Sequence, residues 1–288
     1  MTPIICLLFI LVSPLFGGAV ALVFFGRKKR CLSPTGILLH ALSTQHAPHC
    51  SYYSPVKFAD LLERISTSGF FLTTVGGVQQ LPPADRGKAM IMCFDDGFES
   101  FYRLALPLLQ SRACKTTVFP VAGYIGRPSA WDALPPQNHL TKEQIREIAS
   151  LGHEIGSHTM SHANLTLLND ADLETELSQS KKILEDITGR PVTSVSFPFG
   201  QWNRRVWDKA LELGYSAATS YAGSARKEKG MLPLWGIYSF DSVQDIRDRA
   251  IQQPPVSNAM ARGIVMPHFA KGTPMWKFRK NYALMRKG

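Results

Sequence analysis

The sequence predicts an α/β fold in which residues 31–288 form a distorted, nearly closed (β/α) barrel of about seven strands. Short apolar runs alternate with amphipathic helical segments, and the loops between them are short. Such alternation produces crossover connections between parallel strands. With seven or eight strands, a closed barrel is favoured over an open sheet. An open, doubly wound sheet is the alternative, but the chain has no Gly-rich dinucleotide fingerprint and no phosphate-binding loop.

Five segments have the pattern of helices, and their ends carry typical capping residues. In the first helix, Ser54 is the expected N-cap, Pro55 takes the first helical position and Gly69 ends the helix. The second contains a proline and is expected to break there. The third opens with a capping box formed by Thr141 and Gln144. The expected helices are 54–69, 100–111, 141–152, 170–189 and 202–214.

Eight short apolar runs separate these helices and are expected to be strands. Most are four to eight residues long and end in glycine, proline or polar residues, as strands of a parallel sheet do. The expected strands are 36–43, 70–75, 89–94, 116–121, 153–158, 194–199, 217–221 and 263–269.

Hydropathy sets the first 30 residues apart from the rest. From residue 3 to residue 25 there is no charge, and this is long enough to cross a hydrocarbon core of about 30 Å. A cleaved signal peptide is the competing interpretation because Ala19, Val20 and Ala21 resemble a cleavage site, but no Lys or Arg precedes them. We expect residues 1–30 to be an uncleaved single-pass membrane anchor, followed by one catalytic domain, 31–288.

The net charge of +10 is concentrated at the two ends of the chain. No basic stripe interleaved with aromatic residues occurs between them, so nucleic acid is not an expected partner and a membrane surface is favoured. The basic flank at 27–30 directly follows the apolar span and favours a cytoplasmic side for the domain. The five cysteines show no disulfide pattern, which agrees with a reducing compartment.

Candidate site residues lie at the ends of four of the expected strands. In parallel α/β folds the carboxyl ends of the strands carry the functional site, so these residues are expected to meet at one rim. They are Asp95 and Asp96, His158 and His162, Pro198 with Phe199 and Gly200, and His268. His40 also follows a strand and could line the same cleft.

Two histidines four residues apart, joined by a carboxylate from another strand end, make a three-ligand metal site with positions open for water and substrate. We expect His158 and His162 to bind this metal together with one of the two aspartates, Asp95 or Asp96. Adjacent aspartates point apart, so if Asp96 is the ligand, Asp95 would take a proton from a water that the metal activates. His268, arriving from the far side, would protonate a leaving group. These residue types together suit hydrolysis of a neutral acyl bond.

These motifs resemble those of the NodB-type polysaccharide deacetylases, the fourth family of carbohydrate esterases. The segments "CFDDG", "SHTMSH" and "MPH" are similar to that family's T-F-D-D-G, H-[ST]-x-x-H and L-x-H motifs. The flanking segments "ILLHALS" and "SPVKFADLLERI" resemble its PgaB- and IcaB-like branch. The resemblance covers nearly all of the chain after residue 30, and the motifs in this order are highly specific.

The resemblance implies a distorted TIM-like barrel, the NodB homology domain. It implies a divalent metal, usually zinc although cobalt, nickel or manganese are also used, on Asp96, His158 and His162. It implies Asp95 as base and His268 as acid. The implied reaction is hydrolysis of the N-acetyl or N-formyl amide of an amino sugar in a polysaccharide or lipid-linked glycan.

Other residues of the cleft have weaker assignments. Backbone N–H groups around Pro198, Phe199 and Gly200 would hold an oxyanion together with the metal. Trp202 and Trp235 could stack on sugar rings, although core packing is the more common role for either one.

The chain departs from the family pattern at two arginine positions. Ser196 lies where the third motif often has an arginine, and Leu234 with Trp235 stands where another is common. The groups that orient Asp95 and His268 are therefore not identified by sequence. Met266 replaces the usual leucine of the last motif, a volume-conserving change.

Two alternatives remain open at this stage. A catalytically inactive glycan-binding or scaffold protein of the same fold is compatible with the missing arginines, whereas the complete set of five core positions favours an enzyme. The side of the membrane is also open, because the basic flank favours the cytoplasm and a lipid-linked substrate, whereas the family more often acts outside, on peptidoglycan or exopolysaccharide.

Overall fold

The computed structural model describes residues 35–44, 51–129, 137–221, 228–239 and 241–243. All of them belong to one compact unit, Leu32–Gly288. The expected membrane anchor 1–30 and the expected strand 263–269 with His268 lie outside the described residues. Within the described ranges, no helix has the length and apolar character needed to cross a membrane.

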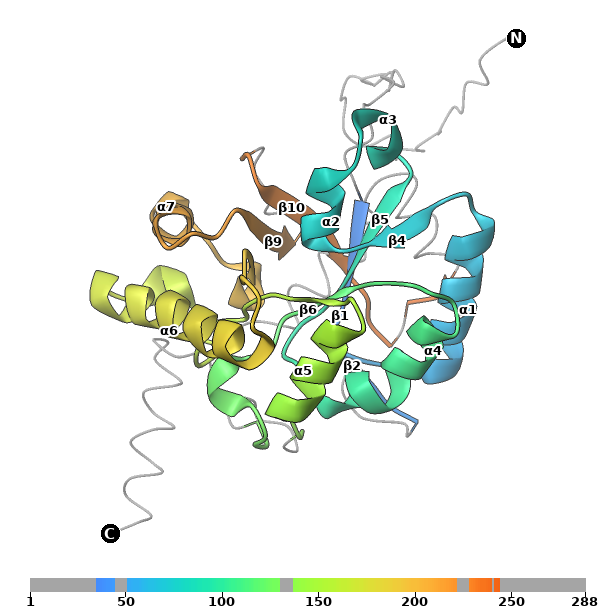
Figure 1. Ribbon diagram of the computed structural model, residues 1–288, viewed down its shortest axis with the longest axis horizontal. Coiled ribbons are helices and arrows are strands. Elements are labelled where there is room, and N and C mark those ends of the chain that lie inside the picture. The colour runs from blue at the N-terminus through green and yellow to red at the C-terminus, as the bar shows by residue number, and fades with distance from the viewer. Residues whose placement is uncertain (1–34, 45–50, 130–136, 222–227, 240, 244–288) are drawn as a thin grey trace, which may run out of the picture. The chain divides into compact units, whose positions relative to one another are not determined.

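Eight parallel strands form the main sheet, in the order β7-β6-β5-β1-β10-β9-β8, with β4 beside β5. Figure 1 labels β1, β4, β5, β6, β9 and β10 among them. The sheet closes on itself through Ser157, which follows β7 and pairs in parallel with Val195 of β8. The N–H of Ser157 donates to the carbonyl of Ser194 at 2.9 Å, and the N–H of Ser196 donates back to Ser157 at 2.9 Å. The strands are β1 (Thr35–Leu39), β4 (Phe71–Thr73), β5 (Ala89–Phe94), β6 (Thr117–Val118), β7 (Glu154–Ile155), β8 (Ser194–Ser196), β9 (Ala217–Tyr221) and β10 (Met231–Gly236). The expected barrel of about seven strands is confirmed.

Strand β10 was not expected from the sequence. It contains Pro233, and a proline argues against a central strand because it donates no hydrogen bond to the ladder. The structure nevertheless places this strand between β1 and β9, with Gly36 opposite Leu234 and Pro233 opposite Ser220. Tertiary pairing on both sides therefore outweighs the local signal.

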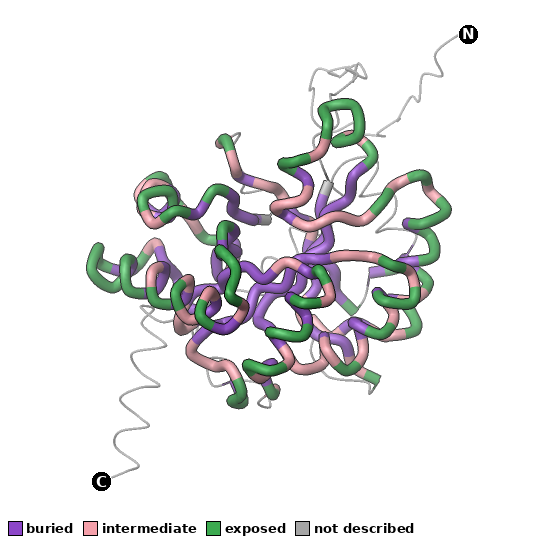
Figure 2. The backbone as a smooth tube through the Cα atoms, viewed as in Figure 1, coloured by how far each residue is buried: buried purple, intermediate pink, exposed green. Residues whose placement is uncertain are grey.

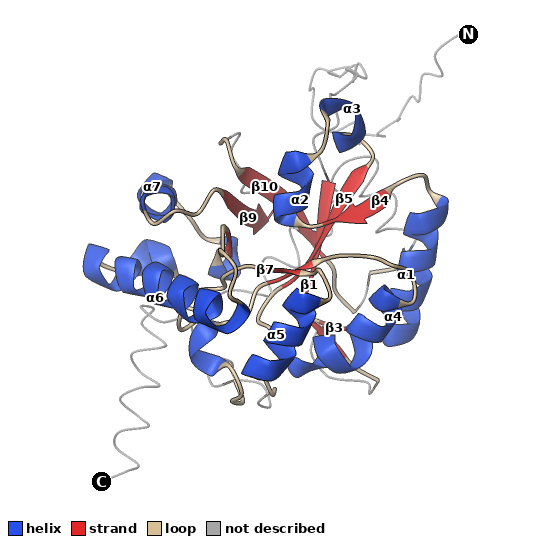
Figure 3. Cartoon of the chain, viewed as in Figure 1, coloured by secondary structure: helices blue, strands red, loops and turns tan. Residues whose placement is uncertain are grey.

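Helices lie around the outside of the strands (Figure 3). The helices expected at 54–69, 141–152, 170–189 and 202–214 are confirmed, and the capping box of Thr141 and Gln144 is formed. The segment 100–111 divides as expected near Pro107, into a π-helical turn and α4. Two short helices between β4 and β5 were not expected. The helices are α1 (Pro55–Thr67), α2 (Val75–Gln80), α3 (Pro83–Arg86), α4 (Leu106–Gln110), α5 (Lys142–Ser150), α6 (Asp170–Thr188) and α7 (Arg204–Glu212).

The core lies along the central strands, which Figure 2 shows as buried. All six residues of β5 are buried, as expected for a strand covered on both faces. Phe94 at its end packs edge-to-face against Phe58 and Phe101, with ring centroids 5.7 and 4.8 Å away. This packing fixes the end of β5 and therefore the position of the two aspartates that follow it.

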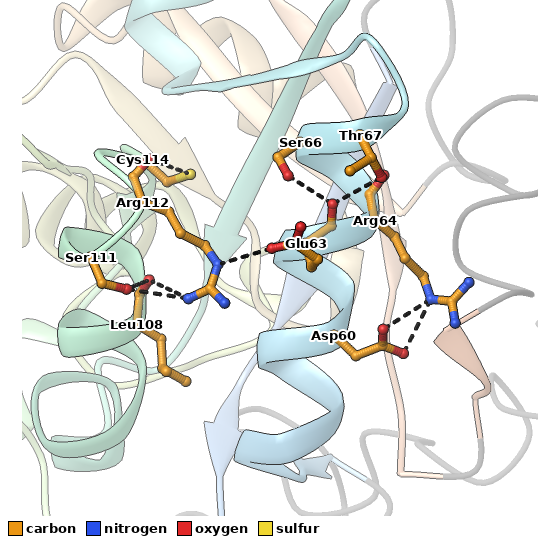
Figure 4. A network of polar contacts seen from close by, with 9 residues as sticks. All are labelled: Asp60, Glu63, Arg64, Ser66, Thr67, Leu108, Ser111, Arg112 and Cys114. Atoms are coloured by element: carbon orange, nitrogen blue, oxygen red, sulfur yellow. Dashed lines mark hydrogen bonds and ion pairs between the residues drawn. The ribbon is translucent and has the colours of Figure 1, made fainter.

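A polar network joins α1 to the segment after α4 (Figure 4). Arg112 donates to the Leu108 carbonyl at 3.4 Å and its Nε lies 4.0 Å from Glu63 Oε2. On the outer face of α1, Arg64 pairs with Asp60 at 3.1 Å. Exposed pairs of this kind contribute about 0–1 kcal/mol each, so the apolar packing between these helices contributes most of the stability here.

Candidate metal and catalytic site

The first part of the site is the turn that follows β5. The N–H of Asp95 donates to the Leu39 carbonyl at 3.0 Å, which continues the pairing with β1. Asp96 and Gly97 then adopt left-handed conformations, with φ of 68° and 69°. A Cβ on Gly97 would lie 2.7 Å from the Pro120 Cα, so only glycine fits here. The chain thus turns sharply between two buried carboxylates.

The second part is the loop 158–162 after β7. The ring centroids of His158 and His162 are 5.0 Å apart. The segment is a turn and not a helix, because Thr159 and His162 have φ of 67° and 56°. The two imidazoles therefore converge through left-handed backbone, and not through the spacing of a helical turn.

The three expected ligands converge. Asp96 Oδ1 lies 3.5 Å from His158 Nε2 and 3.4 Å from His162 Nε2. One ligand atom from each residue falls within 4.8 Å of the other two, and all three residues are buried. A metal held by one carboxylate and two imidazoles fits this arrangement.

The orientation of His158 also fits a metal ligand. Its Nδ1 donates to the Ser196 carbonyl at 2.8 Å, so Nε2 is the nitrogen that faces Asp96 and that could bind a metal once it is deprotonated. Metal-binding histidines are commonly held through their second nitrogen in this way. In addition, Asp96 Oδ1 is buried and accepts no hydrogen bond from the described residues. A buried oxygen without a hydrogen-bond donor is what a cation ligand would look like before the cation binds.

The environment separates the protonation behaviour of the two aspartates. Burial raises the pKa of Asp95, and the nearby charge of Asp96 adds to this effect. Burial alone would raise the pKa of Asp96 too, but the imidazoles facing it outweigh burial and hold that pKa well below its usual range. Burial lowers the pKa of His162 to about 3, so its imidazole is neutral. Paired groups whose pKa values are pushed apart are typical of acid–base sites.

Ser196 is the group that orients Asp95, and sequence reasoning did not find it. Its hydroxyl donates to Asp95 Oδ2 at 2.8 Å, whereas Asp95 Oδ1 accepts no hydrogen bond from the described residues. Ser196 ends β8, across the barrel mouth from β5. Its place in the third motif, where the family often has arginine, was the available signal.

Phe199 and Gly200 follow β8 in a tight turn with φ of 60° and 61°. The Phe199 ring packs edge-on against His162, with centroids 4.6 Å apart. The N–H of Gly200 donates to the Phe197 carbonyl at 2.8 Å and is engaged within the turn. Pro198 is buried, and the role of the Phe199 backbone N–H as an oxyanion donor stays a prediction.

The two tryptophans are both half-buried and pack against the core. The Trp202 ring stacks on Phe197 with centroids 6.5 Å apart, and its Nε1 donates to Ser220 Oγ at 3.1 Å. One face of Trp202 is therefore used for packing. A sugar-stacking role for Trp202 and Trp235 remains a prediction.

His40 lies close to the site, as its position at the end of an expected strand suggested, although the sequence assigned it neither a catalytic nor a metal-binding role. It follows β1, the neighbour of β5, and a positive charge on its ring would lower the pKa of both Asp95 and Asp96. Its Nδ1 is buried and has no hydrogen-bond partner among the described residues. The signal was its position after a strand. His268, the expected acid, lies outside the described residues.

Backbone strain gathers around these residues. Among the described residues, five that are not glycine have positive φ, and four of the five belong to the loops of the site: Asp96, Thr159, His162 and Phe199. Such conformations persist only where the surroundings enforce them, and they cluster at functional sites. The strain is an indication of function that does not depend on any motif.

Comparisons with known proteins agree with this geometry. A family model for polysaccharide deacetylases matches residues 83–218, which include both aspartates and both histidines. YxkH of Bacillus subtilis, a protein assigned to the polysaccharide deacetylases, is 32% identical over 148 residues, covering 51% of this chain and 50% of YxkH. The peptidoglycan-N-acetylglucosamine deacetylase PgdA of Listeria monocytogenes is 27% identical over 161 residues, covering 55% of this chain and 30% of PgdA. The chain thus spans half of one relative and less than a third of the other.

The fold has solved counterparts. The structure of IcaB from Ammonifex degensii superposes with a TM-score of 0.63 at 19% identity, covering 76% of this chain and 97% of that one. The barrel and the residues at its strand ends define a protein of the (β/α)-barrel class with an Asp-His-His group at its mouth. Residues 83–218, which carry this group, match the polysaccharide deacetylase family model, and the barrel resembles that of IcaB.

Proposed function

We propose that this protein is a metal-dependent deacetylase that hydrolyses the N-acetyl or N-formyl amide of an amino sugar in a polysaccharide or lipid-linked glycan. The observation that carries the proposal is the convergence of Asp96, His158 and His162 beside the buried carboxylate of Asp95. The family match and the name of PgdA support an N-acetylated amino sugar as the substrate class.

Asp96, His158 and His162 would hold the metal, for which zinc is the first candidate. A divalent ion bound there would supply Lewis-acid activation of water and of the amide carbonyl. Asp95 accepts the proton of the attacking water, while its second oxygen is held by the Ser196 hydroxyl.

The other steps belong to two further residues. The backbone N–H of Phe199 stabilises negative charge on the carbonyl oxygen. His268 donates a proton to the departing nitrogen. Water and amide are thereby converted to a carboxylic acid and an amine.

We further propose that residues 1–30 anchor the domain to a membrane, so that the substrate is a glycan at or near that surface. The proposal rests on the uncharged span and the basic flank in the sequence. A phosphatase reporter fused after Gly288 tests the side: activity shows that the domain faces away from the cytoplasm.

The direct test is acetate or formate release from a panel of acylated amino-sugar polymers. The full-length protein, purified in detergent, is assayed as isolated, after treatment with a chelator and after addition of Zn²⁺. The proposal expects release that is lost with the chelator and restored by the metal. Stoichiometric metal without turnover on the whole panel would instead indicate a glycan-binding or scaffold protein of the same fold.

A further inference from the structure

Glu176 occupies a position of α6 where the periodicity of the buried face predicts an apolar residue. It lies on the buried face of α6, beside Leu173 and Leu177, and is only 2% exposed. Asp and Glu are almost never fully buried unless they are paired or hydrogen-bonded. The contacts of this side chain should therefore explain why it is there.

The carboxylate binds the loop between the two metal-binding histidines. Its Oε2 accepts hydrogen bonds from the backbone N–H groups of Met160, at 2.9 Å, and Ser161, at 2.8 Å. Its Oε1 accepts the hydroxyl of Ser161. Three donors from two consecutive residues, both between His158 and His162, thus converge on one side chain.

The opposite side of the same loop is held by backbone. The N–H groups of Ala122 and Gly123 donate to the carbonyls of Thr159 and Met160, at 3.0 and 2.9 Å. A Cβ on Gly123 would lie 2.4 Å from the Met160 oxygen, so the approach is as close as glycine permits. The loop is therefore fixed between a backbone ladder and the Glu176 carboxylate.

This fixation matters because the loop is strained. Thr159 and His162 both have positive φ, a conformation that persists only under external constraint. If the Glu176 contacts were lost, the loop could relax toward ordinary φ values. His162 would then move relative to His158 and Asp96.

We propose that Glu176 is a positioning residue that sets the separation of the two imidazoles and, through it, the metal affinity of the site. The inference rests on the proposed metal-binding function. It extends that function to a residue on α6 that touches neither the metal nor the substrate.

The test is zinc affinity, measured on metal-stripped full-length protein by competition with a chromophoric chelator. Glu176→Gln keeps the size of the side chain but replaces one acceptor oxygen by an NH₂ donor. Loss of a group that orients metal ligands typically weakens binding by about 10- to 100-fold, and we expect a loss in this range. Unfolding of each metal-free protein is measured in parallel.

Ile187→Val is the matched control, because Ile187 is buried on the same helix about 16 Å further along. It should lower stability and leave zinc affinity unchanged. If Glu176→Gln binds zinc as the natural protein does, Glu176 is only a structural residue and the inference is wrong. If Glu176→Gln does not fold, Glu176→Asp is used instead, because it keeps the carboxylate but withdraws it by one methylene. Its zinc affinity is compared with that of the natural protein in the same way. Failure of the natural protein itself to bind zinc would instead contradict the proposed function.

Discussion

The hydroxyl of Ser196 donates to Asp95 Oδ2 at 2.8 Å, while the carbonyl of the same residue accepts the Nδ1–H of His158 at 2.8 Å. One residue at the end of β8 therefore orients both the proposed base and a proposed metal ligand. Asp95 and Ser196 are 101 positions apart in sequence, and their strands are not neighbours in the sheet. The contact exists only because the barrel closes.

Ser196→Ala should lower kcat by about 10- to 150-fold, because a hydrogen bond to a charged group contributes about 1.5–3 kcal/mol. The backbone carbonyl that holds His158 is kept, so zinc affinity should stay unchanged. Steady-state kinetics and zinc titration on the same preparations measure both. Ser194→Ala is the control: it removes a buried hydroxyl of the same strand, one that donates to Glu154 at 2.6 Å. Equal kcat losses in both variants would show that Ser196 acts only through stability.

Replacing each of the two adjacent aspartates by asparagine should have different effects, one on catalysis and the other on metal binding. Asp95→Asn removes the proposed base and should lower kcat by about 10²- to 10⁴-fold, with zinc still bound. Asp96→Asn removes a ligand and should lower zinc content itself. Metal analysis and acetate release distinguish the two, and full activity in Asp95→Asn would contradict its role as base.

The convergence of the metal residues could be predicted from sequence. Asp96 comes two residues after the end of β5 and His158 three residues after the end of β7, and the carboxyl ends of parallel strands meet at one rim. The helices were predictable for a similar local reason, since Pro55, Thr141 and Gly189 mark their ends. Local chemistry was sufficient for these features.

Two other features of the site, the contact of Ser196 with Asp95 and the left-handed backbone conformations, depend on contacts between distant segments. A serine at the end of an apolar strand has no signal that it will face Asp95 across the barrel. The left-handed φ of Asp96 and His162 depends on neighbouring segments, such as Pro120 against the adjacent Gly97. Sequence periodicity carries neither kind of information.

The assignment of the acid can be decided by comparing His268→Asn with His40→Asn. We expect the His268 variant to lose about 10²- to 10⁴-fold in kcat and the His40 variant to lose much less, because His40 is assigned here only an electrostatic effect on Asp95 and Asp96. Both variants should bind zinc. The opposite order of kcat losses would transfer the acid role to His40.

The free energy of unfolding should decrease as the pH is lowered, because of His153, which lies away from the metal site. Burial, with a further contribution from Lys115, lowers the pKa of His153 to about 4, and its Nδ1 accepts the N–H of Thr116 at 3.3 Å. The unfolded chain, with a histidine pKa of about 6.5, binds the proton first. The stabilisation is therefore complete above pH 6.5 and is lost as the pH falls toward 4, by up to about 3 kcal/mol.

Urea unfolding of the metal-free protein between pH 7 and 4.5 measures this dependence. His153→Gln should lower stability at pH 7 and flatten the curve by close to one proton. An unchanged slope in His153→Gln would assign the titration to another group.

Gly97→Ala should disturb both the fold and the metal site. The new Cβ would lie 2.7 Å from the Pro120 Cα at a φ of +69°, so a left-handed penalty of about 1–2 kcal/mol is added to a clash with backbone. Relief of the clash moves the turn that carries Asp96, so zinc affinity should fall with stability. Gly126→Ala is the matched control, because Gly126 has a φ of +71° and nothing within 4 Å of the added Cβ. It should show the conformational penalty alone, measured by urea unfolding, with zinc affinity unchanged. Equal losses of stability in the two variants, with zinc affinity retained in both, would mean that contact with Pro120 does not position Asp96.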